Sequence, residues 1–251
     1  MFRQARSLLL CTATLLVAVP AMAQMTPGAE PGDVLSLGQV MVEAGAGMTF
    51  DAEDGTSGAG AQPLIRFGIA PGIELLGGSG GWTSACFGRC AWSPTTAFAG
   101  WRALIPGQMA GFNTAVSGLF YYPTRTDHAQ PRVIESSFML HVDRAIGEAL
   151  LLTFNAEIAR LHDAETAVLR HGEGFGLVWD RGGRWLPLVR FGHRAAAVEG
   201  PEPWYLEMGT GLRMGGAFEY EFAVTRGLNA AEPGWGVAAA VAISHDFRPL
   251  Y

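Results

Sequence analysis

The sequence predicts an all-β protein, an antiparallel up-and-down transmembrane β-barrel of about 12 strands. Segment after segment alternates between apolar residues and small or polar residues, which is typical of strands whose two faces meet different environments. About half of the residues are apolar, yet beyond the first 23 residues there is no apolar run of the roughly 18 residues that a membrane helix needs. Short connections also alternate with longer ones, as in bacterial outer-membrane barrels.

Residues 1–23 are expected to be a cleaved secretory signal peptide. Two arginines precede an apolar run that ends at Val19, and Ala21-Met22-Ala23 has the small-x-small pattern of a cleavage site. The apolar run is about 12 residues long, shorter than the roughly 20 of a membrane anchor. Residues 24–251 are therefore expected to form a single barrel domain.

Twelve segments of the remaining chain carry the alternating pattern. It is clearest near the C-terminus, where Phe218, Tyr220, Phe222 and Val224 share one face of a segment and the residues between them, beginning with Glu219, share the other. The expected strands are 37–50, 62–70, 73–81, 94–105, 109–122, 135–145, 149–160, 166–179, 184–196, 203–214, 217–227 and 234–247.

The connections between these segments form two alternating sets. The short ones lie at 70–72, 106–108, 145–148, 180–183 and 215–216, and the longer ones at 51–61, 81–93, 123–134, 161–165, 197–202 and 228–233. In outer-membrane barrels the short turns are periplasmic. An even number of strands places both termini on that same side.

The second face of these strands distinguishes a membrane barrel from a soluble one. It consists of Gly, Ala, Ser and Thr with few Glu and Arg, and the chain contains no Lys. A soluble β-sandwich or barrel also alternates, but its polar face is a solvated and strongly charged exterior. The observed composition suits a narrow lumen, and most of the seven Trp lie at segment ends, where they would meet the two membrane interfaces.

The charged residues of this face are the candidates for lining the lumen. They are Glu43, Arg66, Glu74, Arg102, Asp143, Glu157, Arg190, Arg194, Glu207, Arg213, Glu219 and Glu221. They either form a matched network that fills and staples the barrel, or they make a selectivity lining for a polar channel. The first interpretation is favoured, because twelve strands enclose far less space than the sixteen to eighteen of porins.

Several motifs resemble a known family. Residues 62–75 resemble a hairpin of the outer-membrane "transporter" family named for the meta-pathway of phenol degradation, although Leu76 replaces a basic residue of that motif. Residues 98–102, 120–124 and 227–233 are similar to later landmarks of the family. The resemblance covers roughly residues 37–247 and implies uptake or export of small, often hydrophobic compounds.

Two cysteines follow the expected signal peptide, Cys86 and Cys90, in one of the longer loops. An exported protein passes through an oxidising periplasm, which favours a local disulfide between them. No His or third Cys lies nearby in the sequence, so no metal site is predicted.

Charge and motifs exclude other classes of function. Loss of Arg3 and Arg6 with the signal peptide changes the formal charge from −6 to −8, which disfavours nucleic acid as a partner. Of the six His, only His245 has an adjacent Ser, and consecutive strand residues face opposite sides. No catalytic residue, enzymatic activity or cofactor is therefore predicted.

The sequence thus predicts an outer-membrane barrel in contact with lipid, serving as a passive conduit for small, possibly hydrophobic molecules. Two alternatives stay open. In the first alternative, the barrel is a structural or interaction subunit of an envelope assembly. In the second, it is a soluble periplasmic ligand-binding barrel.

Overall fold

The computed structural model describes residues 32–50, 57–79, 82–85, 93–94, 96–107, 111–123, 134–163, 166–194, 202–214, 217–229 and 234–247. The expected signal peptide, Cys86 and Cys90 lie outside these residues, so cleavage and the disulfide stay predictions. Among the described residues, no helix has both the length and the apolar character to cross a membrane.

The described residues form strands that follow one another along the chain. These are β1 (Gln39–Phe50), β2 (Ser57–Ala70), β3 (Ile73–Ser79), β4 (Trp82–Ala85), β5 (Ser93–Pro94), β6 (Thr96–Leu104), β7 (Asn113–Pro123), β8 (Glu135–Ile146), β9 (Leu150–Asp163), β10 (Thr166–Trp179), β11 (Trp185–Arg194), β12 (Trp204–Met214), β13 (Phe218–Gly227) and β14 (Trp235–Asp246).

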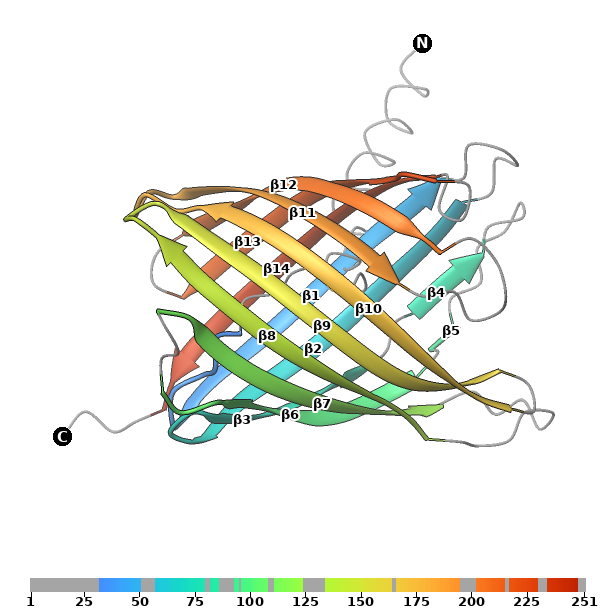
Figure 1. Ribbon diagram of the computed structural model, residues 1–251, viewed down its shortest axis with the longest axis horizontal. Coiled ribbons are helices and arrows are strands. Elements are labelled where there is room, and N and C mark those ends of the chain that lie inside the picture. The colour runs from blue at the N-terminus through green and yellow to red at the C-terminus, as the bar shows by residue number, and fades with distance from the viewer. Residues whose placement is uncertain are drawn as a thin grey trace, which may run out of the picture.

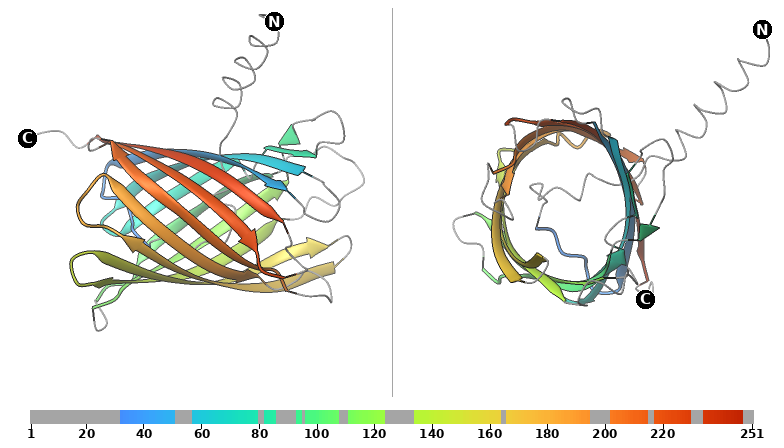
Figure 2. Two further views of the ribbon diagram at one scale, coloured as in Figure 1. Left: turned by 90° about the horizontal axis from the view of Figure 1, so that it is seen from above. Right: turned by 90° about the vertical axis from the view of Figure 1, so that its right-hand side faces the viewer.

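These strands close into a twelve-stranded antiparallel barrel. Each long strand pairs with its neighbours in the chain, and β1 pairs with both β14 and β2, which completes the ring (Figures 1 and 2). β2 pairs with β3 along its second half and with β4 over Gly58–Ala61. β4 and β5 are therefore short extensions beyond β3 and β6, and the predicted fold class is confirmed.

Several strand boundaries differ from the sequence expectation; β7, for example, begins at Asn113 rather than at residue 109, and two extensions have a clear cause. β2 begins at Ser57 rather than at residue 62, because its Gly- and Ala-rich start pairs with the end of β1, where Ser57 lies opposite Phe50. β9 and β10 continue pairing up to Asp163 and Thr166, where a longer loop was expected. In both places cross-strand pairing overrides the weak strand propensity of the local sequence.

The short connections and both ends of the barrel wall lie at one rim, which we call the turn rim; the opposite one is the loop rim. Gln39 of β1 pairs with Asp246 of β14 there. In the turn after β10, Gly182 has a φ of 70° and its N–H donates to Asp180 at 2.8 Å. This bond, together with Arg213 at 2.7 Å, holds the pKa of Asp180 below its ordinary value.

The two faces of the wall are reversed relative to a soluble protein. The largest fully buried side chains of the described residues are polar: His141, Glu74, Glu207, Asn155 and Thr153. Large apolar side chains instead lie exposed on the outside, as on β13, where Phe218, Phe222 and Val224 are exposed. The chain is a transmembrane barrel, and the alternative of a soluble barrel with an apolar core is wrong.

Aromatic side chains mark the two edges of this apolar band. Trp179 and Trp185 lie near the turn rim, and Trp204 and Trp235 near the loop rim. Arg226 lies over the Trp235 ring at 4.8 Å, which places a charge beside the aromatic edge. Such aromatic girdles sit at the interfaces between lipid and water.

The orientation of β13 predicts how it tolerates charge. Phe222 lies mid-strand on the lipid side, so replacing it with Arg should cost roughly 2–4 kcal/mol. Glu221→Gln keeps a hydrogen-bonding group in the interior and should impair assembly less. Heat-modifiable migration on gels after membrane insertion measures folding of both variants. If Glu221→Gln assembles as poorly as Phe222→Arg, the assigned faces are wrong.

Candidate functional site in the barrel interior

The chain enters the barrel wall from inside the barrel. Residues 32–38, which we call the strap, precede β1 and lie within the ring when the barrel is viewed along its axis (Figure 2, right). At the end of the strap the N–H of Gln39 donates to the carbonyl of Ser36 at 3.0 Å, and Gly38 has a φ of 80°. Only glycine adopts this left-handed conformation readily. This tight turn folds the strap back into the lumen.

The strap packs directly against the backbone of β2. The N–H of Gly38 donates to the carbonyl of Gly68 at 2.8 Å. A Cβ at Gly68 would lie 2.0 Å from the carbonyl oxygen of Ser36, far closer than any real contact. The absence of a side chain at Gly68 is therefore what allows the strap to approach the wall.

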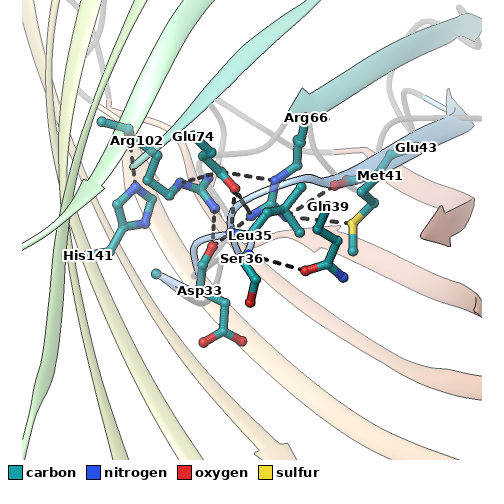
Figure 3. A network of polar contacts seen from close by, with 12 residues as sticks. Asp33, Leu35, Ser36, Gln39, Met41, Glu43, Arg66, Glu74, Arg102 and His141 are labelled. Carbon is teal, nitrogen blue, oxygen red and sulfur yellow. Dashed lines mark hydrogen bonds and ion pairs between the residues drawn. The ribbon is translucent and has the colours of Figure 1, made fainter. Parts of the chain in front are cut away.

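Four charged side chains form a cluster beside the strap, which we call the strap cluster (Figure 3). Arg66 donates to Glu74 at 3.0 Å from both Nε and Nη2, and to Glu43 at 3.2 Å. Arg102 Nε lies 3.8 Å from Glu74. Glu74 is fully buried, so its charge depends on these two arginines.

Charged side chains of the wall also bind the backbone of the strap. Glu74 accepts from the N–H of Leu35 at 2.9 Å, and Arg66 donates to the carbonyl of Asp33 at 2.7 Å. At the start of the strap, Asp143 of β8 accepts from the N–H of Gly32 at 2.6 Å. Hydrogen bonds to ionised groups are stronger than those between neutral groups. The wall thus holds the strap in an extended path across the lumen.

A Ser–His contact lies beneath the strap. Ser117 Oγ and His141 Nε2, on neighbouring strands β7 and β8, are 3.0 Å apart. The sequence analysis did not anticipate this pair. Both residues are almost fully buried, and a Cβ on Gly32 of the strap would lie only 2.9 Å from His141 Cβ. The contact therefore supports the strap and stays out of reach of solvent.

A second charged cluster, the β11–β13 cluster, lies on another arc of the wall. Arg190 of β11 donates to Glu207 of β12 at 2.7 Å and to both oxygens of Glu221 of β13, at 2.6 and 2.9 Å. Thr225 donates to the other oxygen of Glu207 at 3.4 Å. One arginine thus bridges two carboxylates, and the cluster carries a net negative charge.

The other lumen candidates lie apart from both clusters. Glu157 is on the inward face of β9, opposite Gly172 and Met139. Arg213 is half exposed and pairs with Asp180 at the turn rim, and Glu219 lies opposite Arg213 across β12 and β13. The side chain of Arg194 lies outside the described residues.

Small residues line the wall around the β11–β13 cluster. β14 turns a run of small residues inward, and β10 and β12 contribute glycines to the same face. They are Gly172, Gly174, Gly176, Gly209, Gly211, Gly236, Ala238 and Ala240. Glycine has no side chain and the side chain of alanine is too short to reach across the lumen. This part of the wall therefore does not supply partners for the strap.

The strap could not be recognised from the sequence. The strap carries no alternating pattern, and its contacts use backbone N–H and C=O groups, which any residue supplies. The one local signal is Gly38, the glycine that ends the turn before β1. The charged side chains that bind the strap are, in contrast, among the candidates proposed from the sequence: Arg66, Glu74, Arg102 and Asp143.

Comparison with known proteins shows similarity in fold alone. No family model matches the chain, and no curated protein matches its sequence. Among solved structures, the COG4313 outer membrane channel from Pseudomonas putida F1 superposes with a TM-score of 0.68 at 10% identity, over 86% of this chain and 99% of that one. The NanC porin superposes with a TM-score of 0.57 at 6% identity, over 80% and 98%.

The contacts of the strap cluster identify Glu74 as the residue that holds the strap in place. Glu74→Gln leaves a weaker acceptor for the Leu35 N–H and removes the charge that Arg66 binds. A hydrogen bond to a charged group contributes about 1.5–3 kcal/mol, so protection of the Leu35 amide from hydrogen exchange should fall roughly ten- to hundredfold. Glu221→Gln, which removes a carboxylate from the β11–β13 cluster, is the matched control. Equal protection of Leu35 in both variants would contradict the assignment.

Proposed function

We propose that this protein is a passive outer-membrane conduit for small molecules. The observation that carries the proposal is the closed ring of strands whose outside is apolar and whose inside is lined by charged, polar and very small residues. A wall that only had to be filled could do so with apolar side chains, which pack without the cost of burying charge. A polar interior suits solutes that cross in water.

The barrel size and the strap limit what could cross. Twelve strands enclose less space than the sixteen to eighteen of general porins, and the strap occupies part of that space near the turn rim (Figure 2). The cargo is therefore a small molecule rather than a folded chain or a polysaccharide. The short turns mark the periplasmic side, so the strap lies at the periplasmic end of the conduit.

The family resemblance extends the proposal to the type of cargo. The motifs in residues 62–75 and 98–102 resemble the outer-membrane transporters named for the meta-pathway of phenol degradation. A solved outer-membrane channel of similar fold covers 86% of this chain. We infer that the chain belongs with those transporters and carries small compounds of partly hydrophobic character.

The lining charges favour cations among ionic solutes. Of the twelve lumen candidates, seven are acidic and five are basic. In the β11–β13 cluster a single arginine faces two carboxylates. Rings of acidic side chains select cations in narrow pores, so the net negative lining should give a modest cation preference.

Reconstitution in planar lipid bilayers tests the proposal. We expect discrete conductance steps and, in a salt gradient, a reversal potential whose sign shows cation preference. Glu207 and Glu221 should contribute to this preference, so Glu221→Gln should reduce it, whereas Phe222→Leu on the lipid side should not. A barrel that folds but passes neither ions nor small solutes would reject the conduit and favour a structural or interaction subunit of an envelope assembly.

A further inference from the structure

The outer face of the barrel carries a second group of ionisable side chains, away from the lumen. His171 and Glu173 are on β10 and His193 is on β11, and one ligand atom from each lies within 4.8 Å of the others. On β11 the inward residue is Arg190, so His193, three positions further, is on the outward face with Val189. We propose that these three residues form a zinc-binding site at the loop rim.

The strand register brings the three side chains together. Glu173 lies directly opposite His193 across β10 and β11, and His171 is two residues before Glu173 on the same face of β10. Opposite residues on one face have Cβ atoms about 4.5–5.5 Å apart, and next-but-one residues on one strand are about 7 Å apart. Two ligands on one strand and a third across the ladder thus converge without any change in the backbone. β10 and β11 run side by side in Figure 1.

The distances suit a tetrahedral ion of zinc's size. Zinc bonds of about 2.0–2.2 Å place ligand atoms about 3.4 Å from one another. His193 Nδ1 lies 2.8 Å from a Glu173 oxygen, a hydrogen-bond distance that widens by about 0.6 Å when the half-exposed carboxylate turns to admit the ion, and the group spans at most 4.8 Å. His171 is exposed, so its ring can turn toward the other two ligands and close the gap between 4.8 Å and about 3.4 Å. Two imidazoles and one carboxylate leave a fourth position for water, as in catalytic zinc sites.

A fourth side chain orients the central ligand. Glu202, which precedes β12, lies 2.6 Å from His193 Nε2, the ring nitrogen that faces away from Glu173. The ring of Trp204 packs against His193 with centroids 4.3 Å apart. A ligating imidazole commonly donates its other N–H to a carboxylate, which fixes its tautomer and raises its basicity. Glu202 and Trp204 therefore hold His193 with Nδ1 directed at the proposed ion.

The donor set selects the type of ion. Calcium and magnesium prefer shells made of oxygen ligands. Imidazole nitrogen with a single carboxylate suits zinc and the neighbouring transition metals instead. The site lies level with Trp204, in the aromatic girdle of the loop rim, so the ion would tie β10 to β11 where the wall meets the longer loops.

Zinc titration of the folded barrel in detergent tests this proposal. The protein carries no affinity tag and has its cysteines replaced by serine, so that neither an added tag nor a thiol binds the metal. Competition with a chromophoric chelator at about pH 7.5, where free imidazole is neutral, should show one zinc per barrel. A tenfold excess of calcium or magnesium should leave zinc binding unchanged.

Four variants locate the ion. His171→Asn changes an exposed side chain and should weaken zinc binding at least tenfold, and Glu173→Gln should do the same. Glu202→Gln, which alters only the group that orients His193, should weaken binding roughly tenfold with the stoichiometry unchanged. His245→Asn, an exposed histidine at the turn rim, is the control and should bind as the parent does. Heat-modifiable gel migration confirms that each variant folds.

Three results would overturn the proposal, two from the variants and one from the parent barrel. One is zinc affinity in His171→Asn equal to that of the parent barrel. The other is a loss of zinc binding in His245→Asn as large as in His171→Asn. A parent barrel that binds no zinc under these conditions would reject the site directly.

Discussion

The structure depends on one constraint: in the hydrocarbon core of a membrane, every backbone N–H and C=O must find a partner within the protein. A sheet satisfies this only when it closes, and here β1 pairs with both β14 and β2. Closure gives every strand one face toward lipid and one toward the interior. That separation explains why Phe222 is exposed while Glu74 has no exposed surface, the reverse of a soluble protein.

Buried polar groups in the lumen also need partners within the protein. A buried carboxylate is tolerated only when cations and hydrogen-bond donors surround it. Glu74 has Arg66 and the Leu35 N–H as such partners, so the wall and the strap satisfy each other. In the β11–β13 cluster, within the part of the chain that the structure describes, Glu207 and Glu221 both form their ion pairs with Arg190. We therefore expect the strap side of the wall to be the more rigid and the opposite arc to be freer to meet solutes.

Much of the fold could be predicted because alternation is a local signal. Every long strand was anticipated, and two of the misplaced boundaries, at Ser57 and Asp163, are sites where pairing with a neighbour extends a strand beyond its own propensity. The inward charges were also identifiable, since they interrupt an otherwise small-residue face. Their division into two clusters was not, because cross-strand register decides which carboxylate meets which arginine.

The contacts that could not be predicted join segments that are distant in the sequence or that carry no alternating pattern. The strap binds through backbone groups, so its sequence carries no mark of its partners. Ser117 and His141 meet only because β7 and β8 are neighbours, and His193 meets Glu173 only through the register of β10 and β11. The motif His171-x-Glu173 was visible in the sequence, but its third partner lies 20 residues beyond Glu173 and its outward face became clear only in the barrel.

The strap, held by Glu74 and Arg66, is proposed to narrow a polar conduit at its turn rim. Single-channel conductance of the barrel, compared with that of a variant whose mature chain begins at Leu37, tests it most directly. We expect this variant, which lacks the strap residues before Leu37, to give a larger conductance while the barrel remains folded on heat-modifiable gels. An unchanged or smaller conductance in the shortened, folded barrel would contradict it.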